Sequence, residues 1–405
     1  MKLNDTQFRR HAAVPMRVAL VTETYPPEIN GVAMTLGRIV DGLRRRQHPV
    51  QIIRPRQQAQ EFPVRDDMLH EVLVKGLPIP RYPDLRCGLP APNTLVSLWS
   101  ATPPDIVHIA TQGPLGWSAI TAARKLKLPI SSSFHTNFDA YSRHYGLGLL
   151  KPLISGYLRH FHNRTDVTLV PTKGLAKQLR SAGYRNVGIV SRGVDTRLFN
   201  PGRRSTELRT GWGIGGDSLL VSYVGRLAPE KNLDLVFSTF EEIKHARPDA
   251  RLLLVGDGPQ RAARAARHPE HIFAGMRRGE DLAAHYASSD LFLFPSLTET
   301  FGNVTAEALA SGLGVVSYDY AAAAELIEDG HNGALVSPGD SAAFIQSAVN
   351  LATNPARLER FKQRAAASIV RLDWEHVHDE FAATLAELVA THERARHAQN
   401  AVATD

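Results

Sequence analysis

Short apolar runs alternate with helix-like segments through the first half of the chain. Two of these runs, MRVALVT at 16–22 and VQIIRP at 50–55, are short and apolar, as buried parallel strands are. Between them, apolar residues at 32, 36, 39, 40 and 43 recur at the spacing of one helix face. The alternation continues through DIVHIA, WSAITAARKLKL, PISSSFHT, VTLVPT and GLAKQLRSAG. It predicts an α/β fold, with a parallel sheet covered by helices on both faces.

The pattern breaks at GVDTRLFNPGRR, residues 193–204, and then starts again. Strand-like runs SLLVSYVG, ARLLLVGDG, HIFAG, LFLFPS, LGVVSYD and GALVSP alternate there with helical segments. We therefore expect two similar α/β domains with a cleft between them, formed by residues 16–197 and 198–372. Residues 373–405 would form a helix, about 373–398, that reaches back to the first domain, and a tail. Residues 1–15 are an N-terminal extension, and residues 1–13 and 399–405 are expected to be disordered.

Length and composition agree with two globular domains. A chain of 405 residues is too long for one ordinary domain, and 43% apolar residues are enough for a buried core. The one cysteine, Cys87, excludes an internal disulfide and fits a reducing compartment. We interpret it as a spectator thiol, because no histidine-rich segment surrounds it. The N-terminus lacks a signal-peptide core and no apolar run reaches the roughly 18 residues of a membrane span, so we expect a cytoplasmic protein.

The charge balance is basic, with a net charge of +7 and a pI near 9.5. This balance favours a polyanionic partner, although it could also be only a solubilising surface. The stretch 141–164 mixes aromatic, leucine and basic residues, and with the basic segment 44–58 it suits contact with anionic lipid. A nucleic-acid surface and an ordinary helix packed on a sheet are the alternatives for this stretch.

In open α/β sheets, ligands bind at the carboxyl ends of the strands. The loop PPEING after the first strand ends on Gly31, where the backbone can approach a ligand at a helix N-terminus. In the second half, GRLAPEKN begins at Gly225 and places Arg226 and Lys231 five residues apart, which suits a diphosphate. VGDGP, with Asp257, is a second glycine-rich strand end. An ordinary turn or solvated charges are the alternative in each case.

The segment PSLTETFGNVTAEALASG, 295–312, holds two glutamates seven residues apart around a turn. Glu299 falls in the loop, while Glu307 falls inside the helix that starts near Asn303. The backbone N–H groups of Gly302, Asn303 and Val304 are then presented at a positive helix end, where a phosphate binds. Each carboxylate can accept two hydrogen bonds from a vicinal diol. A phosphate with a diol on either side is a nucleotide sugar. The alternative is that Glu307 only complements the helix dipole and that Glu299 is solvated. His135, at the end of another strand, should face this segment from the first domain, unless it is only a packing residue.

Together, several motifs resemble one family, the retaining glycosyltransferases of family 4, which have the GT-B fold of two Rossmann-like domains. The resemblance covers about residues 16–375 and rests on PPEINGVA, FHTNF, SRGVDTRLFNP, GRLAPEKN, VGDGP and the Glu-x7-Glu segment, in this order. Within the family the chain looks most like bacterial lipid glycosyltransferases, namely mannosyltransferases and glucuronosyl- or sulfoquinovosyl-diacylglycerol synthases. One departure is YAAAAEL at 320–326, where the family commonly has a glycine-rich turn. It leaves the shape of the loop near the donor open.

The resemblance implies a role for each candidate residue. Arg226 and Lys231 would bind the donor pyrophosphate and stabilise the leaving diphosphate. Glu299 would hold hydroxyls of the donor sugar, and Glu307 would hold the ribose. Gly225 and Asp257 would belong to the same donor site.

Backbone N–H groups from Phe301 to Val304 would bind sugar and phosphate. Gly31 would border the phosphate and the acceptor, and His135 would contact the sugar near the reacting carbon. Met276 lies where family members cradle the nucleotide base by backbone contacts.

The implied reaction moves a hexosyl group from GDP-mannose or a UDP-sugar to an acceptor hydroxyl, with retention at the anomeric carbon. The sequence has no D-x-D motif, so we expect no obligatory metal and no other cofactor. The expected acceptor is a membrane lipid such as diacylglycerol, on the inner face of the cytoplasmic membrane, and no nucleic-acid partner is expected. A soluble or polysaccharide acceptor, an epimerase of the same fold, a glycosidase and a non-catalytic nucleotide-sugar or membrane-binding module are the alternatives.

Overall fold

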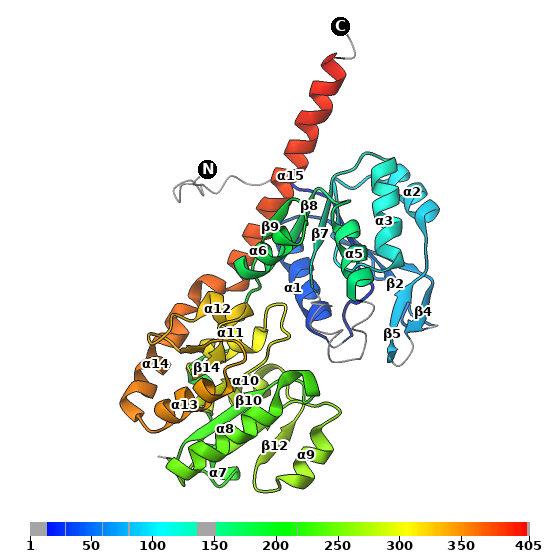
Figure 1. Cartoon of the computed structure of the whole chain (residues 1–405). Coiled ribbons are helices and arrows are strands. Elements are labelled where there is room, and N and C mark those ends of the chain that lie inside the picture. The colour runs from blue at the N-terminus through cyan, green and yellow to red at the C-terminus, as the bar shows by residue number, and fades with distance from the viewer. Residues whose placement is uncertain are drawn as a thin grey trace.

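Two parallel β-sheets form the body of the molecule (Figure 1). The computed structural model describes residues 14–402 except 29, 59, 80–81, 136–150 and 217. One sheet has seven strands and the other has six, and helices pack against both sheets. The expected α/β class with two Rossmann-like domains is therefore confirmed. The domain boundaries given above stay predictions.

The seven-stranded sheet belongs to the first half of the chain. Its strand order is β3-β2-β1-β6-β7-β8-β9, and every pair is parallel. The strands are β1 (Val18–Val21), β2 (Val50–Pro55), β3 (Leu69–Val74), β6 (Ile106–Ile109), β7 (Ile130–Ser133), β8 (Val167–Val170) and β9 (Val187–Ile189). Side chains alternate along β1, so that Val18 and Leu20 enter one apolar core and Ala19 and Val21 enter another. Both faces of the sheet are thus buried, which explains the continuous apolar run in the sequence.

Helices of the first half complete these two cores. They are α1 (Gly31–Arg45), α2 (Pro92–Ala101), α3 (Pro114–Lys125), α5 (Lys151–His162) and α6 (Lys173–Ser181). The hydrophobic pattern did not predict α2, β3, β9 or the antiparallel pair β4 (Gly76–Ile79) and β5 (Tyr82–Gly88). The pair β4–β5 contains two prolines, and β3 carries His70 and Glu71 between its apolar residues, so neither segment resembles a buried strand.

The six-stranded sheet has the order β12-β11-β10-β13-β14-β15, and all six strands were predicted. They are β10 (Leu220–Val224), β11 (Arg251–Val255), β12 (Ile272–Gly275), β13 (Leu291–Phe294), β14 (Gly314–Tyr318) and β15 (Ala334–Val336). The α-helices are α7 (Thr206–Gly211), α8 (Leu233–Ala246), α9 (Arg261–Arg267), α10 (Gly279–Ala287), α11 (Asn303–Ala310), α12 (Ala321–Leu326), α13 (Ser341–Ala352) and α14 (Pro355–Ser368). Three short 3₁₀ turns are η2 (Pro201–Arg203), η3 (Pro229–Lys231) and η4 (Val370–Leu372).

The last helix, α15 (Trp374–Val402), returns from the second half to the first (Figure 1). Its residues Phe381 and Leu385 are buried in the core that contains Val18 and Leu20. Arg46, at the end of α1, donates to Asp379 over 2.7 Å and to Glu375 over 3.1 Å. The predicted crossover is therefore confirmed. The helix continues to Val402, so residues 399–402, which we expected to be disordered, are helical.

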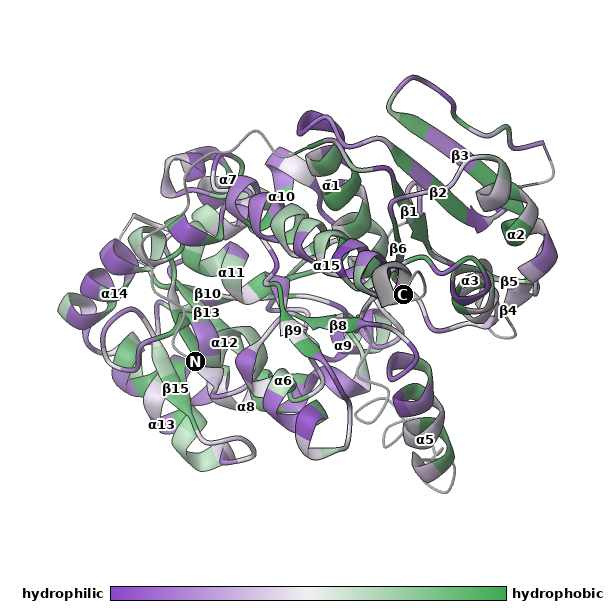
Figure 2. Cartoon of the chain, turned by 90° about the horizontal axis from the view of Figure 1, so that it is seen from above, coloured by the Kyte–Doolittle hydropathy of each residue, from purple (hydrophilic) through white to green (hydrophobic). Residues whose placement is uncertain are grey.

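The distribution of hydrophobic residues fits a protein with layered cores. Figure 2 shows purple and green residues on the same outer helices, for example α14, as expected where one face lies on a sheet. Within the described part of the chain, every helix is too short or too polar to cross a bilayer.

Candidate functional site

The strand orders of both sheets reverse next to their first strands, and ligands of such sheets bind at these points. In the first half the reversal lies between β1 and β6, and in the second half between β10 and β13. A hydrogen bond joins the two halves, and an ion pair ties α1 to the segment that leads into the second half. Glu325 of α12 accepts from the backbone N–H of Lys173 at the start of α6, over 2.7 Å. Arg38 of α1 contacts Asp195 in the connecting segment at 3.2 Å.

The loop after β1 leaves room for a ligand in front of α1. The side chain of Asn30 accepts from the N–H groups of Val32 and Ala33, at 3.1 and 2.9 Å, so those two donors are already capped. A Cβ atom added to Gly31 would meet no atom within 4 Å, and this glycine has no left-handed backbone angle. The local fold therefore does not require glycine at 31, which fits the prediction that a ligand approaches here.

The glycine-rich loops of the second half need their glycines for close packing. A Cβ on Gly256 would lie 2.0 Å from the carbonyl oxygen of Gly225, and one on Gly258 would lie 2.4 Å from that of Leu227. The backbone of Leu227 also donates to the carbonyl of Asp257 over 2.9 Å. The two loops predicted to bind the donor are thus held as one unit at the carboxyl ends of β10 and β11.

Arg226 and Lys231 lie on this unit together with a glutamate that the sequence did not single out. Arg226 Nη1 contacts Glu230 Oε1 at 3.3 Å, and the Arg226 side chain is 39% exposed. Glu230 is buried, and its second oxygen, Oε2, has no hydrogen-bond partner among the described residues. The buried carboxylate of Glu230 therefore orients the guanidinium of Arg226, whose side chain stays partly exposed.

The structure brings Lys231 and Glu299 into direct contact. Lys231 Nζ donates to Glu299 Oε1 over 2.5 Å, and both side chains are only 16% exposed. Ser296 donates to the same carboxylate oxygen over 2.8 Å. Glu299, in the loop that leads to α11, thus contacts the cation predicted for the diphosphate.

The turn before α11 has the predicted form. Gly302 adopts the left-handed conformation, with φ of 91°, and the helix begins at Asn303. Asn303 Oδ1 is buried without a hydrogen-bond partner within the described chain, next to the N–H groups that open the helix. Phe301 is buried in the core, and its carbonyl accepts from Ala322 over 2.7 Å, so only its backbone could contact a ligand.

The loop that departs from the family pattern keeps the geometry of a glycine turn. Ala321 has φ of 53°, in the left-handed region that favours glycine. The preceding Tyr320 donates from its hydroxyl to the carbonyl oxygen of Glu299 over 3.0 Å. This hydrogen bond ties the loop to the Glu299 segment.

Glu307 lies inside α11 in a largely apolar environment. Tyr286 donates to its Oε2 over 2.9 Å, and burial raises the pKa of Glu307 to about 7. Tyr286 was not among the predicted site residues, because nothing in the sequence connects α10 with α11. The two glutamates thus differ: Glu299 is paired with a lysine, while Glu307 has a pKa raised into the neutral range.

His135 lies in the first half at the end of β7, where it meets Arg192. Arg192 Nη2 and His135 Nδ1 are 3.0 Å apart, and His135 Nε2 is buried without a hydrogen-bond partner in the described chain. Burial lowers the pKa of His135 far below its usual value, so the ring is neutral. Burial also lowers the pKa of Arg192 to about 10, while the nearby Glu299 opposes this shift. Arg192 therefore stays charged at neutral pH. It is part of the motif SRGVDTRLFNP, but nothing in the sequence assigns it a role.

Asp257 and Met276 lie at the same edge of the second sheet as these groups. Asp257 accepts from the N–H of Gly258 over 2.8 Å, and its side chain is half exposed. Met276 follows β12 and is 53% exposed. The backbone of Asp257 is tied to the Arg226 loop through Leu227. The donor roles of Asp257 and Met276 stay predictions. In the motif FHTNF, the residues after His135 lie outside the described chain, as do residues 141–150.

Cys87 is unsuited to nucleophilic attack. Burial and the neighbouring Glu23 raise its thiol pKa to about 11, so it is protonated at neutral pH. This agrees with its interpretation as a spectator. Burial raises the pKa of Glu23 as well, and its carboxylate accepts from the N–H of Leu115 over 3.3 Å. Glu23 follows β1 and is a second carboxylate that sequence reasoning missed.

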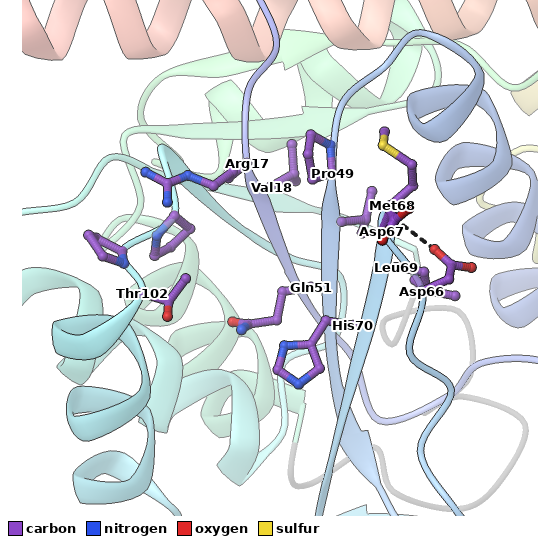
Figure 3. Close-up of a pocket in the computed structure, with 13 residues that line it drawn as sticks. Arg17, Val18, Pro49, Gln51, Asp66, Asp67, Met68, Leu69, His70 and Thr102 are labelled. Atoms are coloured by element: carbon purple, nitrogen blue, oxygen red, sulfur yellow. Dashed lines mark hydrogen bonds between the residues drawn. The ribbon is translucent and has the colours of Figure 1, made fainter.

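A separate cavity of about 120 Å³ lies at the opposite edge of the first sheet (Figure 3). Its lining includes Arg17, Gln51, Met68, His70 and Thr102, close to the amino ends of β1, β2 and β3. The side-chain oxygen of Gln51 already accepts a hydrogen bond from Trp99 Nε1 over 2.9 Å. The cavity contains none of the predicted site residues, and we do not assign it to the donor.

Comparison with known proteins agrees with this geometry. A family model described as Glycosyltransferase Family 4 matches residues 29–198, and one described as Glycosyl transferases group 1 matches residues 218–354. A GDP-mannose-dependent alpha-mannosyltransferase of Corynebacterium glutamicum is 31% identical over 381 residues, which cover 94% of this chain and 91% of that protein. An alpha-monoglucosyldiacylglycerol synthase of Acholeplasma laidlawii is 26% identical over 380 residues, covering 87% and 92%.

Among solved structures, a sucrose-phosphate synthase of Thermosynechococcus elongatus superposes with a TM-score of 0.77 at 16% identity, covering 93% of this chain and 100% of that one. Two facing Rossmann-like domains joined by a returning helix therefore define the GT-B class of glycosyltransferases. Within that class the chain belongs to glycosyltransferase family 4, and it is a nucleotide-sugar-dependent hexosyltransferase.

Proposed function

We propose that this enzyme transfers a hexosyl group, with retention, from GDP-mannose or a UDP-sugar to a hydroxyl of a membrane lipid such as diacylglycerol. The names of two relatives support the proposed donor and the proposed acceptor. One relative is a GDP-mannose-dependent alpha-mannosyltransferase, and the other is an alpha-monoglucosyldiacylglycerol synthase. Residues 198–372 would bind the donor and residues 16–197 the acceptor. A soluble or polysaccharide acceptor is the alternative.

The observation that carries the proposal is the cluster of cations and unpartnered polar atoms in the cleft. Lys231 and Arg226 lie on one loop unit, and Arg192 approaches from the other half. Buried His135 Nε2 and Asn303 Oδ1 lack hydrogen-bond partners among the described residues, although buried polar atoms are generally paired. A bound nucleotide sugar would supply partners for them.

The proposed chemistry is electrostatic. The bond between the anomeric carbon and the diphosphate breaks, and the diphosphate leaves with the electron pair. Arg226, Lys231 and the N–H groups of Phe301 to Val304 stabilise the developing charge. The acceptor hydroxyl attacks the same face and gives its proton to the leaving phosphate. No group of the chain is required as a covalent nucleophile, and no metal ion is required at this site.

The remaining groups would position the donor. Glu299 holds sugar hydroxyls, Glu307 holds the ribose, and Met276 lies beside the base. His135 contacts the sugar near the reacting carbon, while Gly31 borders the phosphate and the acceptor. Gly225 and Asp257 belong to the loops that carry the cations.

An exposed apolar face supports a membrane partner. On α5, Leu153 is 70% exposed and Tyr157 is 43% exposed, and the basic residues Arg159 and His160 lie near the end of the same helix. Apolar side chains beside cations suit insertion between anionic headgroups. We therefore place the enzyme on the inner face of the cytoplasmic membrane, without a nucleic-acid partner.

The test is incubation of the purified protein with a panel of UDP- and GDP-sugars and vesicles with or without anionic lipid, followed by mass spectrometry of the products. We expect one sugar on a lipid hydroxyl, and more enzyme pelleting with anionic vesicles at low salt. Arg226→Ala and Lys231→Ala should each lower turnover by at least about 100-fold, because each removes a charge at the leaving group. Arg267→Ala, at an exposed arginine of α9, is the control.

Each competing function gives a different product. Full turnover in both cation variants would contradict the proposed site. Glycosylation of soluble acceptors alone would contradict the lipid acceptor, and an isomerised sugar would indicate an epimerase. Sugar release from a glycoside without a nucleotide would indicate a glycosidase, and donor binding without any product would indicate a binding module.

A further inference from the structure

A cluster of histidine and glutamate side chains lies on the second domain, away from the cleft. It is formed by the segment His268–His271, which joins α9 to β12, and by the facing side of α8. Because this segment precedes β12, it lies at the amino end of that strand. The candidate site lies at the carboxyl ends, so the cluster belongs to the opposite edge of the sheet.

Potential metal-ligand atoms converge in this cluster. One ligand atom each from His268, Glu270 and His271 lie within 4.8 Å of one another. His268 Nδ1 and His271 Nε2 are each 3.4 Å from the same carboxylate oxygen, Glu270 Oε1. Glu241 Oε1 of α8 lies 3.8 Å from His271 Nε2.

These separations match those of a tetrahedral metal site. Zinc binds histidine nitrogen and carboxylate oxygen at about 2.0–2.2 Å, which puts ligand atoms of a tetrahedron roughly 3.3–3.6 Å apart. The two distances to Glu270 Oε1 fall in this range. The Glu241 side chain is 62% exposed and is free to rotate, so it could approach as a fourth ligand.

His271 supplies a second and independent observation. Its side chain is only 4% exposed, yet Nε2 has no hydrogen-bond partner among the described residues and points towards the two carboxylates.

Aromatic packing holds both rings in place. His268 stacks on Phe237 with ring centroids 4.5 Å apart, and His271 meets Phe240 edge-on at 5.1 Å. The two histidine rings are nearly parallel to each other, at 6°. Because packing already fixes these two rings, they would lose little conformational entropy when a metal ion binds.

We propose that His268, Glu270 and His271 bind one divalent first-row transition metal ion such as Zn²⁺, with Glu241 or water as the fourth ligand. Imidazole and carboxylate ligands suit this class of ion. The bound ion fixes the segment that enters β12, the edge strand that leads to Met276, and it also joins this segment to α8 where Glu241 is the fourth ligand. Its role is to stabilise the fold, and it is independent of the metal-free transfer proposed for the cleft.

The test uses full-length protein that has been treated with a chelator and desalted. Calorimetric titration with ZnCl₂ should show one tight site per chain, and CoCl₂ should give the visible absorption bands of tetrahedral Co²⁺. Kd should rise at least about 10-fold in His268→Asn and in Glu270→Gln, since each removes a ligand. His245→Asn, an exposed histidine of α8, is the matched control and should leave Kd unchanged. Glu270 is largely exposed, so its variant should fold, which circular dichroism would verify.

Thermal unfolding supplies a second measurement. Zn²⁺ should raise the Tm of the wild-type protein but not that of Glu270→Gln. Absence of a stoichiometric Zn²⁺ site would overturn the proposal. So would equal affinity of the wild type and both ligand variants, which would place the bound ion elsewhere among the 17 histidines.

Discussion

At the scale of single residues, the two glutamates of the Glu-x7-Glu segment differ in charge. Glu299 is in contact with a lysine, whereas Glu307 accepts a hydrogen bond from the Tyr286 hydroxyl and has a pKa raised to about 7. A protonated carboxyl loses one of its acceptor positions, and a ribose diol needs acceptors. Ionisation of Glu307 should therefore control donor affinity.

We predict that donor affinity falls about 10-fold when the pH is lowered from 8 to 6, because Glu307 becomes protonated in this window. The stability of the ligand-free fold should change in the opposite direction. The folded pKa is raised, so its stabilising effect is present below the ordinary value of 4.5 and is lost as the pH rises through 7.

Donor titration by calorimetry and urea unfolding across this pH range measure both effects. Glu307→Gln is the isosteric control and should bind donor weakly at every pH. A wild-type affinity that does not vary between pH 6 and 8 would contradict this role of Glu307.

Some of the site residues could be predicted from the sequence because they follow strands directly. Gly31, Arg226, Lys231 and Glu299 are recognisable in this way, since strand ends are visible as the end of an apolar run. Arg192 could not be assigned a role, because its partner His135 is 57 residues away in the chain. Tyr286 was missed for the same reason, since its partner Glu307 lies 21 residues away on another helix. Glu230 lies only four residues from Arg226, but nothing in the sequence shows that its carboxylate is buried against the guanidinium.

At the scale of elements, two glycines that look alike in the sequence have different physical reasons to be glycine. Gly302 has φ of 91°, and an added Cβ would lie 3.3 Å from Glu299 Cγ. Gly31 has neither a left-handed angle nor a neighbour within 4 Å. The turn before α11 thus requires glycine for its own geometry, while the start of α1 does not.

We predict that Gly302→Ala lowers the free energy of unfolding by about 1–2 kcal/mol, because the new side chain is strained at positive φ. It should also weaken donor binding by displacing the N–H groups of α11. Gly31→Ala should leave stability unchanged within about 0.5 kcal/mol but should lower turnover, because its methyl group enters the space proposed for the ligand. Urea unfolding and steady-state kinetics of both variants measure this difference. Full turnover in Gly31→Ala would remove Gly31 from the site.

The alternation of strands and helices was predictable at this scale, including all six strands of the second sheet and the start of α11 at Asn303. The strands of the second sheet are buried on both faces, so each is a short apolar run in the sequence. The antiparallel pair β4–β5 was not predictable. Its two strands contain Pro78 and Pro83, so the segment lacks the apolar pattern of a buried strand.

At the scale of the whole molecule, α15 makes the stability of the first domain depend on the end of the chain. The helix follows η4 of the second domain, and a backbone bridge joins Asp373 to Val194 at this point. Eight residues after Asp373, Phe381 is 2% exposed in the core of the first domain, where its ring meets His108 edge-on at 5.1 Å. The core of the first domain is therefore completed by a residue that follows the second domain in the sequence.

We predict that Phe381→Ala lowers the free energy of unfolding by about 3–5 kcal/mol, since it leaves a cavity in a close-packed core. In differential scanning calorimetry the loss should appear as a lower Tm of the first domain, because the side chain packs only there. Glu387→Ala, on the exposed face of the same helix, should change stability by less than about 0.5 kcal/mol. Donor binding measured below the transition should persist in Phe381→Ala, because the proposed donor groups lie mainly on the second domain. If Phe381→Ala were as stable as the wild type, α15 would not be part of the first core.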